Sequence, residues 1–199
     1  MPEFIRQSSE DEMILEFVRA ELESPIHRDR CKIPSGYTLA ELVGHPDLKN
    51  ADHNAARLSM LFYRGYATRS SLFTGFPREV AWTLHRFTLA EIGSFKYAKV
   101  PPWSTLVDHD RLVSEGAMEI ENARDRALSL KVPVKAILDV RRKFETGKTF
   151  SRLIAAEIDG SYVIVEGNAR ATAFIGSRED RPVEAIVGHA DNFKDWPLR

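Results

Sequence analysis

The chain lacks most of the features that assign a protein to a class on their own. It has one cysteine, Cys31, among 199 residues, which excludes an internal disulfide framework and a metal site of several cysteines. It has no apolar run long enough to cross a membrane, and its first residues do not follow the pattern of a signal peptide. Its formal net charge is -1, which argues against strong nonspecific attraction to nucleic acid. We therefore expect a cytoplasmic protein without a membrane partner.

The residues that are present describe an ordinary globular chain. Hydrophobic residues make up 43% of it and charged residues 29%, and the length allows one domain or two small ones. In the first half, apolar residues follow Ser-x-x-Glu or Thr-x-x-Glu capping boxes at Ser9, Thr38 and Thr88, as expected of helices. A helix over 51–62 and another from Pro77 through Leu84 complete a helical first half.

Two aromatic segments that contain glycine, 62–66 and 72–77, lie between these helices. They suit the walls of a pocket in which a planar base stacks on an aromatic ring. They also suit the core and turns of the helical half, which is the interpretation that we favour. His27 near Cys31 would form a thiolate–imidazole pair only if the fold brought the two together, and a structural thiol is the usual outcome.

The second half predicts two helices and then strands. The spacing of apolar residues favours helices over 114–130 and 133–145, the second bracketed by Pro133 and Gly147. Arg141, Arg142 and Lys143 lie in its last turns, where the helix dipole favours cations. A nucleic-acid or phosphate-binding patch is the alternative interpretation of these three residues.

The segment from Ser151 to Phe174 carries the strongest signal. Two apolar runs flank Asp159-Gly160, a dipeptide that accommodates the positive φ angles of a tight hairpin. The second run ends in Glu166-Gly167-Asn168-Ala169-Arg170, which leads directly into a predicted helix. A glycine turn at a helix N-terminus presents free backbone N–H groups to an anion, and Arg170 would add a guanidinium contact. The segment therefore predicts a phosphate site.

This arrangement resembles the ParB/sulfiredoxin-like fold. In that superfamily a helix precedes a hairpin, and the second strand ends in an acidic residue, Gly, two variable residues and Arg, before a short helix and a further strand. The corresponding elements here are expected at 133–145, 152–158, 162–165, 166–170, 169–175 and 181–188. The resemblance implies an α+β fold in which residues 87–199 form a small ParB/sulfiredoxin-like mixed α/β domain. Residues 1–86 would be a helical region packed on it.

The resemblance implies a nucleotide-binding protein that carries out phosphoryl-transfer or phosphodiester chemistry, as a phosphotransferase or a nuclease. The N–H groups of Gly167, Asn168 and Ala169 and the side chain of Arg170 would hold the phosphates of a nucleoside triphosphate with Mg²⁺. Glu166 would be a metal ligand or general base. The loop that helps to form the ligand site in this superfamily adds Trp103, Ser104 and Asp108, the last as a second catalytic carboxylate.

Several departures from the family's motifs support an alternative. The catalytic cysteine of sulfiredoxins and the two histidines of the related free serine kinases are replaced here by Asn168 and Ala169. The chain also ends soon after the fold, without the helix-turn-helix module of ParB partition proteins. The alternative is a non-catalytic regulatory or interaction protein that binds nucleic acid or a protein partner.

Other polar groups carry weaker signals. Asp108, His109 and Asp110 are metal ligands or an acid–base pair in one interpretation, and solvated loop residues in the one that we favour. His189 follows the final predicted strand, and the sequence leaves open whether it lies near the phosphate site.

Overall fold

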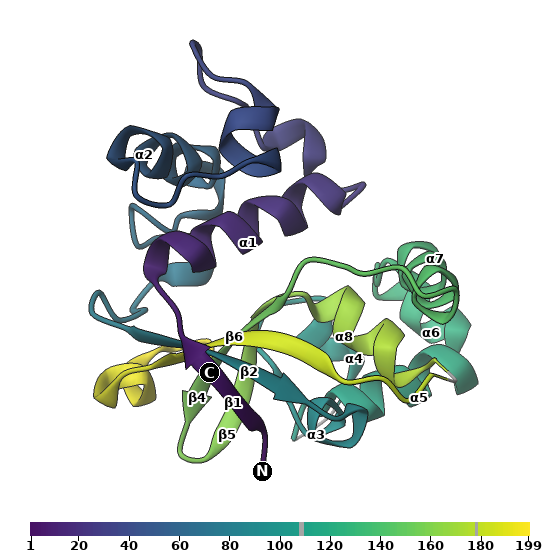
Figure 1. The fold of residues 1–199 in the computed structure, drawn as a ribbon. Helices are drawn as coiled ribbons and strands as arrows, with labels where there is room; N and C mark the ends of the chain where they lie inside the picture. The colour runs from purple at the N-terminus through teal and green to yellow at the C-terminus, as the bar shows by residue number, and fades with distance from the viewer. Residues whose placement is uncertain (108–109, 178) are drawn as a thin grey trace.

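The chain has an α+β fold built on one mixed sheet. The computed structural model describes residues 1–107, 110–177 and 179–199. Six strands lie in the order β1-β2-β6-β4-β5-β3 (Figure 1). Their bounds are Glu3–Gln7 (β1), Ala81–Phe87 (β2), Lys96–Tyr97 (β3), Leu153–Ile158 (β4), Ser161–Glu166 (β5) and Val183–His189 (β6). β6 runs parallel to β4 and β3 runs parallel to β5, whereas the other neighbours are antiparallel.

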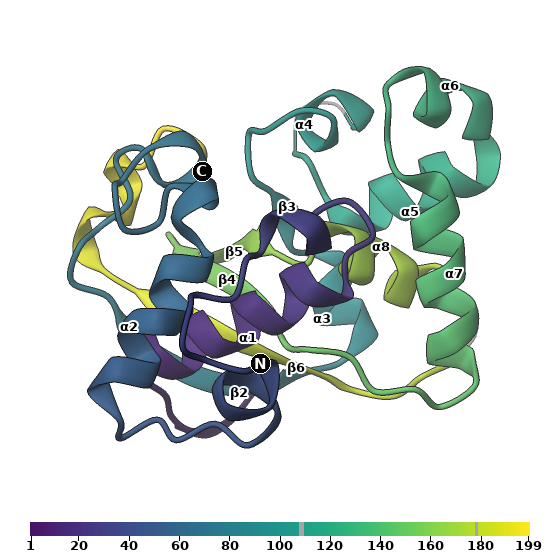
Figure 2. The ribbon, with the colours of Figure 1, turned by 90° about the horizontal axis from the view of Figure 1, so that it is seen from above.

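Helices cover both faces of this sheet. The longer helices are α1 (Glu10–Glu23), α2 (Ala51–Met60), α5 (Val113–Asn122), α7 (Val134–Glu145) and α8 (Asn168–Ile175), and the shorter ones are α3 (Leu89–Gly93), α4 (Trp103–Leu106) and α6 (Arg124–Ser129). Figures 1 and 2 show α1 crossing one face with α2 beyond it, while the helices from α3 onward lie on the other side. Among the described residues, no helix combines the length and apolarity that crossing a membrane requires.

The side chains of β4 show how the sheet serves two cores. Ile154 and Ala156 belong to the core under α1, whereas Leu153 and Ala155 belong to the core under α8. Successive side chains of a strand point to opposite faces, so a strand covered on both faces is apolar at nearly every position. This explains the continuous apolar run in this part of the sequence.

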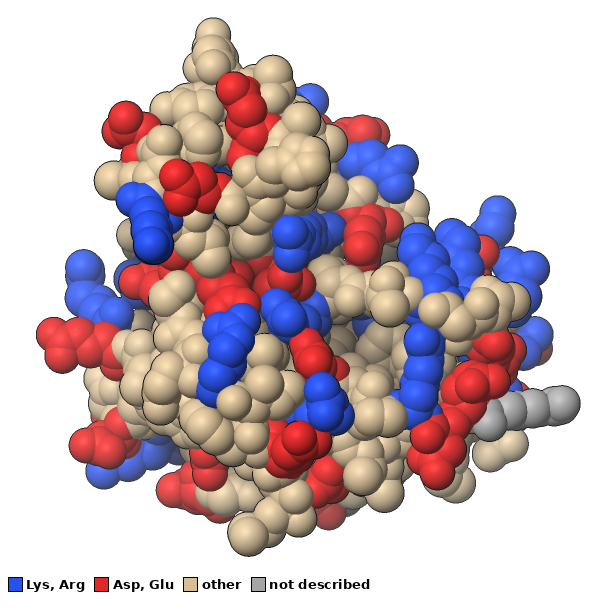
Figure 3. Space-filling model, in the orientation of Figure 1, with Lys and Arg blue, Asp and Glu red and all other residues tan. Residues whose placement is uncertain are grey.

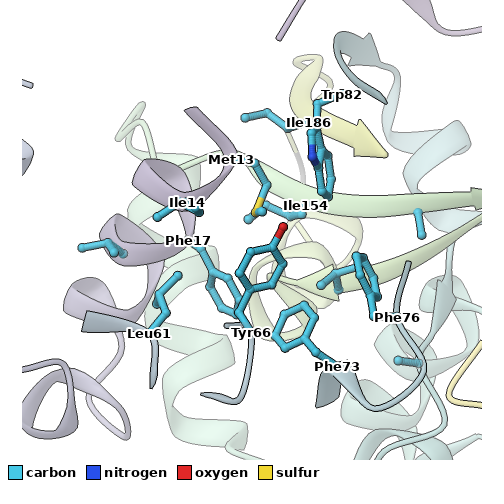
Figure 4. Close-up of a cluster of buried hydrophobic side chains, with 14 of the residues drawn as sticks. Met13, Ile14, Phe17, Leu61, Tyr66, Phe73, Phe76, Trp82, Ile154 and Ile186 are labelled. Atoms are coloured by element: carbon cyan, nitrogen blue, oxygen red, sulfur yellow. The ribbon is translucent and has the colours of Figure 1, made fainter. Parts of the chain in front are cut away.

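The aromatic segments 62–66 and 72–77 supply much of the core under α1. Figure 4 shows Phe17 of α1 beside Tyr66 and Phe73, whose rings meet edge to face at 4.8 Å between centroids. Phe76 extends the cluster toward Trp196 near the C-terminus. Core packing is therefore confirmed for Tyr66, Phe73 and Phe76, whereas Tyr63 is only half-buried and Phe62 is 57% exposed.

Most of the predicted elements are present, with two corrections. The capping boxes at Ser9 and Thr88 begin α1 and α3, and Asp159 and Gly160 adopt φ values of 50° and 73° in the β4–β5 turn. The predicted helix over 114–130 is divided at Ala123, the residue between α5 and α6.

The prediction of a helix from Pro77 through Leu84 was wrong, because residues 81–87 form strand β2. The apolar spacing of Ala81 and Leu84 is also compatible with a strand. Trp82 and Leu84 enter the core under α1, with Thr83 between them on the other face. β2 lies between β1 and β6, so the sheet uses residues from both sides of position 87.

Gly116 lies where α5 packs against the sheet. A Cβ added there would overlap the ring of Tyr97, which is fully buried and whose hydroxyl is 2.7 Å from the Thr172 hydroxyl. We expect Gly116→Ala to lower the free energy of unfolding by about 1–3 kcal/mol, the usual cost of overpacking. Gly93→Ala in α3 is the matched control, since its Cβ would meet no atom closer than 3.5 Å. Denaturant unfolding of both variants would test this, and equal stabilities would contradict it.

Candidate functional site

The predicted phosphate turn joins β5 to α8. Glu166 ends β5, Gly167 has a φ of 107°, and α8 begins at Asn168. A Cβ at position 167 would lie 2.5 Å from a methyl group of Leu153 and 3.0 Å from Arg170 Nη2, so both conformation and packing require glycine. Gly167 also has no side chain to cap the first-turn N–H groups of α8, which leaves the positive end of this helix uncapped by its N-cap residue.

Arg170 is held inside the protein. Its exposed fraction is only 6%, and its Nη1 donates hydrogen bonds to the backbone oxygen of Ser151, at 3.0 Å, and to the Ser151 hydroxyl. Nη2 has no hydrogen-bond acceptor within the described structure and lies 3.6 Å from Glu166 Oε1. Arg170 therefore ties the turn to the start of β4, and its charge reaches the turn through Nη2.

Glu166 lies between two guanidinium groups. Oε1 faces Arg170, and Oε2 accepts a hydrogen bond from Arg64 Nη2 at 3.3 Å. Arg64 comes from the short turn Phe62–Arg64 of the helical region. Glu166 thus links the helical region to the phosphate turn, and both of its oxygens face cations.

A cleft of about 760 Å³ opens beside the turn. Glu166, Asn168 and Ala169 form one side of it, and Trp103 forms another. The remaining wall is largely apolar and also carries basic side chains, of which Arg30 and Arg64 come from the helical region and Lys99 and Lys131 from later in the chain. A second hollow of about 460 Å³ lies between α1 and α7 and includes Gly167 and Arg170. The turn therefore separates two hollows.

The predicted site residues are divided between these places. Asn168 and Trp103 line the cleft, Gly167 and Arg170 line the second hollow, and Glu166 and Ala169 line both. Trp103 is mostly buried and stacks on Tyr97 with 5.2 Å between ring centroids.

Two other predicted residues are not placed in the cleft. Ser104 is not among the described residues that line it, and its N–H donates to the backbone oxygen of Val100 at 3.1 Å. Asp108 lies outside the described residues, as does His109.

A buried carboxylate that the sequence analysis missed lies behind the cleft wall. Glu21 of α1 is 1% exposed, and its Oε2 accepts a hydrogen bond from the Tyr63 hydroxyl. Its Oε1 is 3.3 Å from Arg64 Nε, and its Oε2 is 3.7 Å from His27 Nδ1. Burial and the nearby charge of Glu166 raise the pKa of Glu21 to about 7, against the opposing effect of Arg64.

The sequence did contain a signal for Glu21. It follows Phe17 by four positions and Val18 by three, so it falls on the apolar stripe of α1. An acidic residue on a buried helix face requires polar partners, and those partners come from distant parts of the chain. The partners themselves could not be read from the local pattern.

Cys31 and His27 do not form a reactive pair. Burial, assisted by the charge of Glu21, raises the pKa of the Cys31 thiol to about 11. Burial and then the charge of Arg64 lower the pKa of His27, which disfavours an imidazolium beside the thiol. The expectation of a structural thiol agrees with these environments.

Comparisons with models of protein families, with curated proteins and with solved structures found no match to this chain. The resemblance to the ParB/sulfiredoxin-like fold therefore stays a prediction.

Proposed function

We propose that this protein binds a nucleotide in the cleft beside the phosphate turn. The observation that carries the proposal is the convergence of basic side chains on an uncapped helix N-terminus. Arg30, Lys99 and Lys131 line the same cleft as the first residues of α8. The carboxylate in the cleft wall, Glu166, is balanced by Arg64 and Arg170. Such a site favours a ligand with several negative charges.

The aromatic side chains of the cleft favour a nucleotide over a simple phosphate. Tyr63 and Trp103 lie in its walls, and a planar base can stack on rings of this kind. The volume of about 760 Å³ is within the range of small-molecule sites. In this proposal the phosphates lie at Asn168 and Ala169, and the base lies toward the aromatic wall.

The geometry supports binding better than phosphoryl transfer. A metal ligand or general base needs an accessible lone pair, but both oxygens of Glu166 face guanidinium groups. Within the described residues no cluster of three His, Cys, Asp or Glu side chains suits a metal ion. Mg²⁺ would therefore enter with the phosphates of the nucleotide rather than occupy a protein site.

The basic residues of α7 do not favour a nucleic-acid partner. Figure 3 shows basic side chains gathered over α7 with acidic ones beside them. Arg142 and Lys143 both pair with Asp139, and Arg141 pairs with Glu121 and Glu145. Paired charges contribute little attraction for a phosphate backbone, so the unpaired surplus at the cleft is the better anion site.

Calorimetry with ATP, CTP, GTP and ADP, each with and without Mg²⁺, tests this proposal. We expect one nucleotide to bind, and the double variant Lys99→Ala/Lys131→Ala to weaken its affinity by about tenfold or more, as the loss of charge-assisted contacts predicts. Both residues are exposed, so the variant should fold normally. Lys135→Ala, at an exposed position of α7, is the matched control, and it should bind the nucleotide as the parent does.

Two results would contradict the proposal. One is the absence of binding by every nucleotide, and the other is equal affinity for the parent and the Lys99/Lys131 variant. Release of phosphate by the parent would show that the protein also turns the nucleotide over, and would return phosphoryl transfer to consideration.

A further inference from the structure

Two hydrogen bonds and one ion-pair contact join four polar side chains on the face of the sheet opposite α1. Thr83 of β2 lies 2.6 Å from Nε2 of His189 on β6, and His189 Nδ1 lies 2.8 Å from Glu157 Oε2 on β4. His85 Nε2 approaches the same Thr83 hydroxyl at 2.9 Å. These strands are neighbours in the sheet, and the register places Glu157 beside His189 and Thr83 diagonally across from it.

The Thr83 hydroxyl has one proton and three potential acceptors, since its oxygen also lies 3.4 Å from the backbone oxygen of Val187. A threonine hydroxyl has one proton to donate, so only one of the two imidazole nitrogens can accept it. The shorter contact is to His189, whose other nitrogen faces a carboxylate that only accepts. The tautomer with the proton on Nδ1 turns that N–H toward the Glu157 carboxylate and leaves Nε2 to accept from Thr83, and this is the state that the proposal below uses. His85 Nε2 then donates to the Thr83 oxygen.

We propose that Thr83, His189 and Glu157 form a second site that transfers an acyl group from a carboxylic ester. The arrangement of hydroxyl, imidazole and carboxylate matches the roles of nucleophile, general base and orienting group. Glu157 is a positioning residue, because it acts through His189. His85 Nε2 contacts the Thr83 oxygen and so helps to fix the position of the hydroxyl before it reacts.

The reaction balances with these groups and water alone. The Thr83 oxygen forms a bond to the ester carbonyl carbon as its proton passes to His189 Nε2. The bond from that carbon to the alcohol oxygen then breaks, and the alcohol leaves with this proton. Water, deprotonated by the same nitrogen, attacks the acyl-threonine and releases the carboxylic acid while Thr83 regains a proton.

The surroundings indicate an apolar acyl group. His189 and Glu157 are about one-third exposed, whereas Thr83 is 9% exposed, so the array reaches the surface at His189 and Glu157 and Thr83 lies beneath them. In Figure 1 the helices on this face lie toward the first residues of β6, away from His189. Phe4 on the neighbouring edge strand is 54% exposed and contacts His85 edge to face. An apolar acyl chain can lie against this ring.

An alkyl fluorophosphonate probe tests the proposal, because it labels hydroxyls activated in this way with loss of fluoride. We expect mass spectrometry of digested protein to find the adduct on the peptide that contains Thr83. Thr83→Ala should abolish it, whereas Thr83→Ser, which keeps the hydroxyl and the hydrogen bonds, should retain it. His189→Gln and Glu157→Gln should slow labelling by about a hundredfold or more, in the range of general-base catalysis.

The controls separate this chemistry from a purely structural role of the four residues. Glu157→Asp, which keeps the carboxylate, should label faster than Glu157→Gln. Thr105→Ala, at an exposed threonine of α4, should label as the parent does. Failure to label Thr83 in the folded parent, or an equal rate in His189→Gln, would overturn the proposal. Nucleotide binding in the cleft is independent of either result.

Discussion

Replacing Glu21 with glutamine is expected to remove a large pH-dependent loss of stability. In the folded protein the pKa of Glu21 is raised from 4.5 to about 7, so the folded state binds this proton more tightly than the unfolded state. The resulting stability is fully present below pH 4.5 and is lost as the pH rises through about 7. A shift of this size corresponds to about 3 kcal/mol, at roughly 1.4 kcal/mol per pKa unit.

Glutamine has nearly the same shape and still accepts the hydrogen bond from Tyr63, but it does not ionise. We therefore expect Glu21→Gln to be more stable than the parent above pH 7 and to lose this advantage toward pH 4.5. Urea unfolding across this pH range measures the difference. If the free energies of unfolding of Glu21→Gln and of the parent changed in parallel with pH, Glu21 would not titrate as described.

The second large effect is expected from Arg57, a fully buried residue of α2. Its guanidinium donates to the backbone oxygens of Leu42 at 3.0 Å and Asp47 at 3.1 Å, and to the side-chain oxygen of Asn54. These bonds hold the loop between α1 and α2 to α2. Arg57→Met keeps an apolar stem of similar length but removes the donor from the buried Leu42 oxygen and from the partly buried acceptors of Asp47 and Asn54. We expect a loss of about 3 to 5 kcal/mol, since each unsatisfied group costs about 1–3 kcal/mol.

Chemical denaturation with far-UV circular dichroism would measure this loss. Arg142→Met on α7 is a matched control, because Arg142 is 75% exposed and has only a surface ion pair with Asp139. Its stability should stay within about 0.5 kcal/mol of the parent. A loss at Arg57 no greater than at Arg142 would mean that the loop is held by its apolar contacts alone.

The predicted and observed structures agree where local chemistry decides the conformation. Asp159-Gly160 formed the expected turn because few other residues tolerate two consecutive positive φ values. The Thr88 box formed because both of its reciprocal hydrogen bonds are local. β2 was mistaken for a helix because it pairs with strands about eighty and a hundred residues away, and no local pattern records those partners.

The candidate sites were predictable to the same limited extent. The glycine turn could be found because its backbone conformation is encoded in five consecutive residues. The burial of Arg170 could not be predicted, because it depends on a hydrogen bond to Ser151, which lies in the loop just before β4. The hydrogen-bonded array of Thr83, His189 and Glu157 needs the strand order β2-β6-β4, which is not the order of these strands in the sequence.

The position of β1 beside β2 has a mechanical consequence. These strands are adjacent and antiparallel, and Gln7 pairs with Thr83, so residues 8–82 form one long insertion in a β-hairpin. The Ser8 N–H also donates a hydrogen bond to the backbone oxygen of Trp82, with 2.9 Å between nitrogen and oxygen, so the two ends of the insertion are joined where it leaves the sheet. Both chain connections of the insertion therefore pass through one hydrogen-bonded neck, which limits its rotation about a single linker. The residues that the insertion contributes to the cleft are positioned by strand pairing at the edge of the sheet rather than by a free tether.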